Sequence, residues 1–237
     1  MPRRYFVLAL ALAVAAGCIR LGFWQLDRLA QRRSRNAQEL SRLTLPVLDV
    51  SDGANTPEPF RRIRATGMLD FSREVALTAR THDGSPGVYL VTPLARAGTD
   101  SLLLVVRGWV YSPDAATVDF VRWREPAAVA VEGFALRFAP DSAKPDSSTR
   151  MARAVRRLDH ARLQQRLGAP VAGYYVILTS APLAPDSAPV RLGPPALDEG
   201  PHFSYALQWF LFATIFGAGG AFVVLRAREA HPVEGRS

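Results

Sequence analysis

The fold is decided by a stretch near the end of the chain, HFSYALQW at residues 202–209, which opens an uncharged segment. No Asp, Glu, Lys or Arg occurs from Phe203 to Leu225, and Arg226 follows. At about 1.5 Å of rise per residue, a helix of this length crosses a hydrocarbon core of about 30 Å. Aromatic residues at one end and cations at the other are typical of a helix seated between two membrane interfaces and in contact with lipid. We therefore predict a transmembrane helix over residues 202–226, followed by a tail at 227–237.

A second apolar run lies near the N-terminus. Residues 5–19 are uncharged, and apolar character resumes after Arg20. We predict a first transmembrane helix within residues 1–26, which continues as a polar helix to about Ser41. Three alternatives stay open from the residues alone: a cleaved secretory signal, a lipoprotein signal ending at Cys18, and a twin-arginine signal.

Small residues recur every fourth position in both apolar runs, a spacing typical of closely packed membrane helices. The two stripes are Ala9, Ala13 and Gly17, and Ala213, Gly217 and Ala221. We expect the helices to pack through them. Charge does not orient the pair, because five arginines flank the two helices on each side and long domains translocate largely regardless of charge.

Residues 27–201 form the predicted extracytoplasmic domain. Short β-like segments separated by Gly, Pro and Asp predict an antiparallel sheet or a small barrel. The predicted strands are residues 62–69, 74–80, 87–92, 101–111, 128–138 and 174–179. The run at 101–111 is the most apolar of them and predicts a central strand. A helix is predicted at 158–168, so the class is α+β with one or two helices.

Composition and motifs argue against several classes of function. The net charge is +8, but Lys144 is the only lysine and the arginines are scattered without a nucleic-acid-binding motif, so no nucleic-acid partner is expected. The single cysteine excludes an intramolecular disulfide. No catalytic motif is present, and we expect no enzyme. Asp70, Asp119 and Glu125 fall in predicted turns, where no buried pairing is expected.

Three histidines bear on the choice of a site. We expect a structural role for His82, in a turn, and a solvated or helix-capping role for His160. His202 differs because it follows Pro201 at the mouth of a predicted membrane helix. An interfacial His that contacts only water or headgroups is one interpretation. The other is an axial ligand of a cofactor in the interface, for which haem is the obvious candidate.

Aromatic and cationic residues surround this position in the predicted helix pair. Along a helix, His202, Tyr205 and Trp209 share a face. If the two helices pack, Trp24 and Arg28 reach the same membrane surface. A cation, aromatic walls and a His suit an amphipathic ring with propionates. An aromatic belt without a ligand explains the tryptophans equally well.

Four segments together resemble a known family. These are GFWQLDR at 22–28, PGVYLVTPL at 86–94, VVRGWV at 105–110 and HFSYALQWF at 202–210. Their order and spacing are similar to those of the Surfeit-locus-1 (Shy1-like) family of cytochrome c oxidase assembly proteins, and the likeness extends over residues 21–226.

The resemblance implies two transmembrane helices in the bacterial inner membrane, both termini in the cytoplasm and the main domain in the periplasm. It implies a role in building haem–copper oxidases, with subunit I and other assembly factors as partners. His202 matches the family's haem-linked His. The expected function is therefore help with haem a delivery or stabilisation at subunit I. A scaffold without haem, or a periplasmic lipoprotein or enzyme with a cleaved N-terminal signal, are the alternatives.

Overall fold

The computed structural model describes residues 2–139, 153–180, 188–194 and 197–229. The chain divides into two compact units, Met1–Gln38 with Leu197–Ser237, and Glu39–Ala196. Each unit is described by itself.

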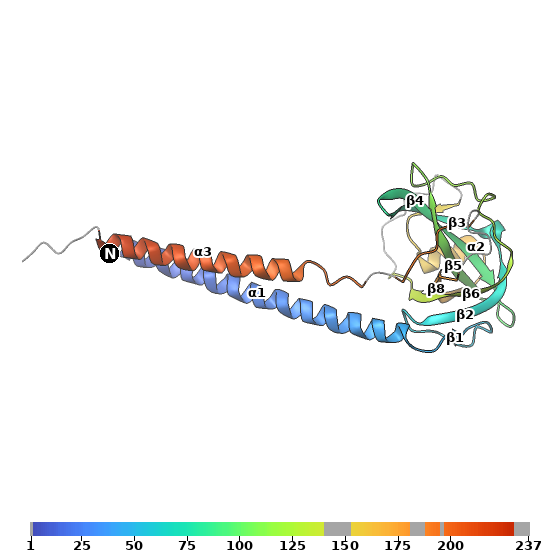
Figure 1. Ribbon diagram of the computed structural model, residues 1–237, viewed down its shortest axis with the longest axis horizontal. Helices are drawn as coiled ribbons and strands as arrows, with labels where there is room; N and C mark the ends of the chain where they lie inside the picture. Colours follow the sequence, from blue (N-terminus) through green and yellow to red (C-terminus); the bar gives the residue numbers. More distant parts are fainter. Residues whose placement is uncertain (1, 140–152, 181–187, 195–196, 230–237) are drawn as a thin grey trace, which may run out of the picture. The chain divides into compact units, whose positions relative to one another are not determined.

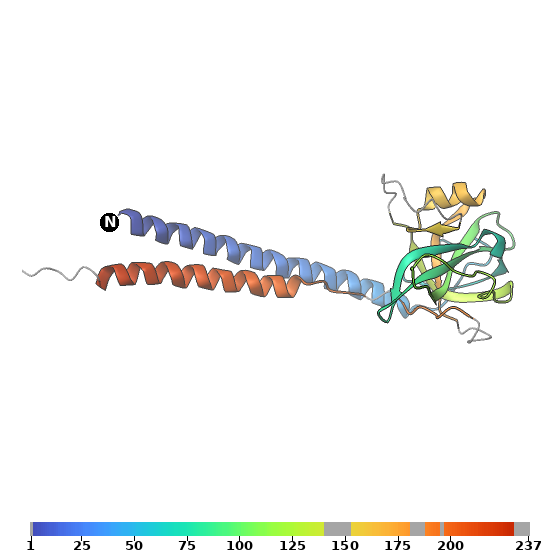
Figure 2. The ribbon, with the colours of Figure 1, turned by 90° about the horizontal axis from the view of Figure 1, so that it is seen from above.

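Two helices form the first unit. Helix α1 (Pro2–Leu43) has 42 residues and helix α3 (His202–Glu229) has 28. In both views α3 lies alongside α1 and runs in the opposite direction (Figures 1 and 2). Tyr5–Leu43 and His202–Arg226 are long and apolar enough to cross a membrane. The predicted polar continuation of the first helix is confirmed, because α1 runs on to Leu43 without a break.

The face of α1 that packs on α3 follows a 3–4 spacing. Its buried positions are Ala15, Cys18, Gly22, Gln25 and Leu29. On α3 the buried positions lie seven apart, at Ala206, Ala213 and Gly220. We call these eight residues the seam. An average spacing of 3.5 residues stays on one helix face, which is the condition for continuous contact between two helices.

The predicted stripe on the first helix is wrong. Ala9, Ala13 and Gly17 are exposed, and nothing lies within 4 Å of a Cβ placed at Gly17. Steps of four residues turn about 400° and drift away from a fixed face, since 3.6 residues complete one turn. The close approach is instead at Gly22, where a Cβ would lie 2.6 Å from the Phe210 ring. On the second helix, Ala213 is a seam position as predicted, whereas Gly217 and Ala221 are not.

The second unit is a small closed barrel of mixed strands. Its strands are β1 (Leu48–Asp49), β2 (Arg62–Leu69), β3 (Val75–His82), β4 (Ser85–Ala95), β5 (Leu102–Tyr111), β6 (Ala128–Arg137), β7 (Ala154–Val155) and β8 (Val171–Leu178). The order is β1-β2-β6-β8-β5-β4-β3-β7, and a further pairing of β2 with β4 closes a ring of five strands. Pairs β5–β8, β1–β2 and β3–β7 are parallel.

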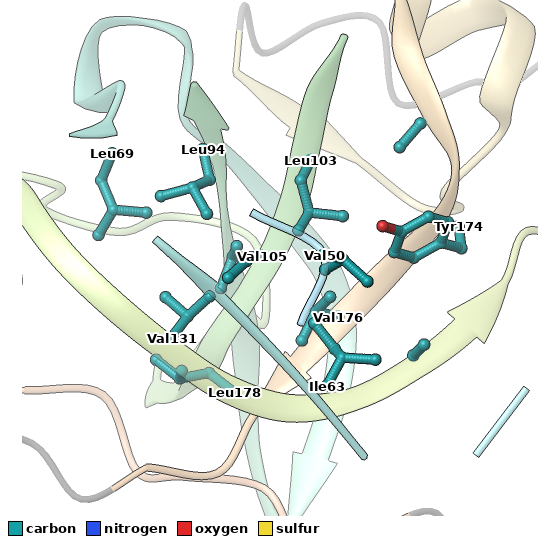
Figure 3. Packing of buried hydrophobic residues seen from close by; sticks show 13 residues of the cluster. Val50, Ile63, Leu69, Leu94, Leu103, Val105, Val131, Tyr174, Val176 and Leu178 are labelled. Carbon is teal, nitrogen blue, oxygen red and sulfur yellow. The ribbon is translucent and has the colours of Figure 1, made fainter. Parts of the chain in front are cut away.

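Alternating side chains of the ring fill the interior, as Figure 3 shows. They include Ile63, Leu69, Leu94, Leu103, Val105, Val131, Tyr174, Val176 and Leu178. The ring closes at Gly67, where a Cβ would lie 2.2 Å from the Ala95 carbonyl oxygen. Only glycine permits that approach of β2 to β4. The central position predicted for residues 101–111 is confirmed, because β5 pairs on both sides.

Short helices complete this unit. Helix α2 (His160–Leu167) buries Leu163 and Leu167 against the outer face of the sheet. Asp159 caps it by accepting a hydrogen bond from the Arg162 amide, and Gly168 ends it in the left-handed conformation. A 3-10 turn, η1 (Phe71–Arg73), precedes β3. The β-rich class flanked by two apolar helices is thus confirmed, and the barrel alternative is the correct one.

Candidate functional site

The His202 ring is held by α1. Its Nδ1 lies 2.9 Å from Oε1 of Gln25. An amide oxygen only accepts, so Nδ1 carries a proton and donates, and in the neutral ring Nε2 then has the lone pair. Among the described residues, this is the one hydrogen bond of the His202 ring. The arrangement joins residues 177 positions apart in the sequence.

The segment before α3 is tied to α1 by polar contacts. Arg33 forms a bidentate pair with the Glu199 carboxylate, with two N–O distances of 2.9 Å. Arg32 Nε donates to the Asp198 carbonyl oxygen at 2.8 Å, and Asn36 donates to the Leu197 and Asp198 carbonyl oxygens. The hydrogen bond from Arg33 lowers the pKa of Glu199. These contacts define where His202 begins its helix.

Gly200 lies beside the imidazole of His202. Its φ of 72° is in the left-handed region, which favours glycine, and a Cβ at this position would lie 3.5 Å from His202 Nε2, at ordinary contact distance. Glycine therefore suits the turn and keeps a side chain away from this nitrogen. The Asp198 carboxylate stabilises this turn by accepting from the Gly200 amide at 2.9 Å.

The other predicted site residues fall into two groups. Arg28 lies over the Trp24 ring at 5.5 Å, and Trp24 is 48% exposed. Tyr205 is 46% exposed. Trp209 instead packs against the seam cluster of Ala15, Cys18 and Ala213. The structure thus brings Trp24 to Arg28 and His202 to Gln25, while Trp209 contributes to helix packing.

Gln25 was missed by sequence reasoning, although the quoted motif at 22–28 contains it. The available signal was a polar side chain within an apolar segment, at i+3 from Gly22. Such residues usually face a partner helix, because an amide in an apolar environment must be hydrogen-bonded.

A second polar cluster is buried in the barrel unit. Arg107 is fully buried at a β-bulge, where Leu90 pairs with Gly108 and Val91 pairs with Val106. A bulge turns the extra side chain to a new direction. Arg107 donates to Glu74, to Thr92 Oγ1 at 2.8 Å, and to Glu125 at 2.8 Å.

The expectation that Glu125 has no buried pairing is wrong. Its side chain is 13% exposed and bridges Arg107 and Arg191. Sequence spacing gave no indication of this, because Arg191 lies 66 residues away. Asp70 is half-buried and pairs with Arg73 at 2.5 Å, whereas Asp119 accepts from backbone amides within its own turn.

These contacts explain the motif at 107–109 structurally. Arg191 donates to the Arg107 carbonyl oxygen at 2.7 Å, and Trp109 and Val190 exchange two backbone hydrogen bonds of 2.8 Å. A Cβ at Gly108 would lie 2.3 Å from the Val190 carbonyl oxygen. The motif therefore holds the segment around Val190 against β5.

The remaining described histidines have structural contacts. His160 Nε2 lies 2.9 Å from the Val171 carbonyl oxygen and its ring is 4.9 Å from that of Phe138. It therefore joins α2 to β8, and the expectation that it is solvated or caps the helix is wrong. His82 stacks at 5.3 Å on Trp109, in line with the structural role expected. Among the described residues, no group of three or more His, Cys, Asp or Glu side chains is arranged to hold a metal ion.

A closed β-barrel unit and a pair of apolar helices, with a His held at the start of the second helix, define a β-barrel protein with two helices long and apolar enough to cross a membrane. Residues 12–214 match the SURF1 family. The chain belongs to this family, which is membrane-associated and generally linked to cytochrome oxidase assembly, and whose members are assembly factors and not known enzymes.

Similar proteins carry the same description. A SURF1-like protein of Rickettsia felis is 33% identical over 93 residues, which cover 38% of this chain and 40% of the relative. A SURF1-like protein of Rickettsia conorii is 34% identical over 96 residues, or 38% of each chain. The matches thus span about two fifths of these relatives. An uncharacterized SURF1-like protein of Mycobacterium bovis is 28% identical over 248 residues, covering 97% of this chain and 90% of the relative.

Proposed function

We propose that this protein is an assembly factor of a haem–copper (cytochrome c) oxidase that assists haem a delivery to subunit I or its stabilisation there. It acts with other assembly factors, is anchored in the bacterial inner membrane by α1 and α3, and presents the barrel unit in the periplasm. It catalyses no reaction in this role.

One observation carries the haem part of the proposal. The His202 ring is oriented through Nδ1, and Nε2 has no hydrogen-bond partner within the described part of the chain. A neutral imidazole with one nitrogen hydrogen-bonded and the other free is the usual state of a metal-binding His. An interfacial His that serves only as an anchor needs no such orientation.

The nearby residues fit an amphipathic ring with carboxylate groups. His202 offers the nitrogen, and Tyr205 and Trp24 offer exposed aromatic faces. Arg28 offers a guanidinium for a propionate, since Arg and carboxylates pair bidentately. Trp209, predicted as a wall, fits less well because it packs in the seam. The haem would become a redox group of the oxidase, and this protein would hold it during transfer.

A membrane scaffold that never binds haem is the second candidate. It is favoured by the pairing of Arg28 with Trp24, which gives both side chains a partner within α1. Both candidates require the helix pair, but only the first requires a free Nε2.

Complementation in cells tests the two candidates. In a strain that lacks this protein, the wild-type chain should restore assembled oxidase with its full haem a content. The His202→Ala variant should be inserted in the membrane at the wild-type level but should yield oxidase with less haem a. His82→Ala is the matched control and should complement fully. Full haem a content with His202→Ala would support the scaffold and contradict the haem role.

A further inference from the structure

We propose that Gln25 is the positioning residue of His202: it holds the Nδ1–H tautomer and the ring orientation, so that the Nε2 lone pair is kept free on the side of Gly200. The part of this inference in which the lone pair binds a haem iron rests on the proposed function. The hydrogen bond and the tautomer are independent of the proposed function.

Burial shows that Gln25 is placed for this contact. It is 9% exposed and is the one buried polar side chain in the described parts of α1 and α3. It occupies a seam position between Gly22 and Leu29, where the other members are small or apolar. A buried amide costs free energy unless it is hydrogen-bonded, so an apolar residue would serve packing better at this position. The amide therefore serves its partner, His202.

The barrel unit supplies an internal contrast. His160 uses its other nitrogen, because Nε2 donates to the Val171 carbonyl oxygen at 2.9 Å and a carbonyl oxygen only accepts. His160 must carry its proton on Nε2. His202, whose Nδ1 faces the Gln25 oxygen, carries it on Nδ1. The two histidines therefore have opposite tautomers, and only that of His202 leaves Nε2 free as a ligand.

The tautomers can be read from nitrogen spectra of the full chain. We would label histidine with ¹⁵N, reconstitute the protein without haem in lipid nanodiscs, and record two-bond ¹H–¹⁵N correlations at pH about 8, above the ordinary His pKa of about 6.5. His202→Gln and His160→Gln assign the two ring patterns. We expect the Nδ1–H pattern for His202 and the Nε2–H pattern for His160.

Two substitutions of Gln25 test whether this residue determines the tautomer of His202. Gln25→Leu removes the acceptor, and the His202 resonances should shift to a mixture of tautomers. Gln25→Glu keeps an acceptor, and the Nδ1–H pattern should persist. The His160 pattern should not change in either variant, which shows that the barrel unit is folded. The Nε2–H pattern in the wild type, or an unchanged His202 pattern in Gln25→Leu, would overturn the proposal.

Haem retention gives a second readout that separates the two claims. Purified from cells that make haem a, Gln25→Leu should retain haem about 10- to 100-fold more weakly than wild type, as is typical when the partner of a metal-ligating His is removed. Gln25→Glu should retain it. If the wild type shows the Nδ1–H pattern but retains no haem, the positioning by Gln25 stands and the proposed haem role fails.

Discussion

The helix pair and the barrel unit each bury a polar cluster, and the two clusters differ in whether a charge lies at the centre. In the barrel, Arg107 contacts Glu74, Thr92 and Glu125, and Arg191 pairs with Glu125. Oε2 of Glu74 has no hydrogen bond and lies 3.8 Å from the Arg153 guanidinium. In the helix pair, Gln25 hydrogen-bonds one nitrogen of His202, and the ring makes no other hydrogen bond within the described part of the chain.

The barrel cluster is structural, whereas the proposed function falls to the cluster in the helix pair. A buried guanidinium must be paired, so the contacts around Arg107 are those that burial of a charge demands. A neutral imidazole at the end of a helix seam is not forced to have such a partner. The presence of a buried partner on one nitrogen alone is what indicates a use for the other.

Removing the charge at the centre of the barrel cluster should have the largest effect. Arg107→Leu leaves the buried Glu74 carboxylate with only the 3.8 Å ion pair of Arg153 and removes a partner of Glu125, and we expect a loss of about 3–5 kcal/mol in the free energy of unfolding. Chemical denaturation of the purified full chain, followed by tryptophan fluorescence, measures it.

The exposed ion pair of Arg64 with Glu132 provides the control. Arg64→Ala should cost about 0–1 kcal/mol, because exposed pairs contribute little. Equal losses for Arg107→Leu and Arg64→Ala would show that the buried cluster has no special role in stability.

Substitution at the close contact in the seam should have the next largest effect on stability. In Gly22→Ala a new Cβ meets the Phe210 ring, and the overpacking should cost about 1–3 kcal/mol. Gly17→Ala, on the exposed face of α1, should be neutral or slightly stabilising, because alanine favours a helix. Unfolding by SDS titration, followed by circular dichroism, compares them. A larger loss for Gly17→Ala would indicate that α1 packs through Ala9, Ala13 and Gly17, as first predicted.

Lowering the pH should have the smallest effect of these changes. It should act on the segment that precedes α3. Because the folded pKa of Glu199 is lowered, its contribution is complete above the ordinary Glu value of about 4.3 and is lost as pH falls through the lowered pKa. Protection of the Gly200 amide from hydrogen exchange should therefore exceed that in Glu199→Gln above that pH, and the difference should disappear as pH falls through the lowered pKa. Loss of protection already at about pH 6–7 would contradict this assignment.

Local patterns in the sequence predicted local structure well. The strands at 62–69 and 101–111 alternate or are continuously apolar, and Asp159 and Gly168 bracket α2 by capping chemistry. These features depend on neighbouring residues alone, so they can be read without the fold.

Long-range contacts could not be predicted in the same way. The closure of β2 on β4, the pairing of Glu125 with Arg191 and the contact of Gln25 with His202 join residues that are distant in sequence. Small-residue spacing identified helix packing but not the correct face, because three- and four-residue steps alternate along a seam. For the candidate site, the residue types were predicted and their partners were not.

The absorption spectrum of the protein tests the central claim most directly. Purified in mild detergent from cells that make haem a, the wild-type chain should carry a haem a spectrum. His202→Ala should lose it, and His82→Ala, altered in the barrel unit, should keep it. A wild-type protein without haem, or a His202→Ala variant with an unchanged spectrum, would contradict the proposal that His202 holds haem for the oxidase.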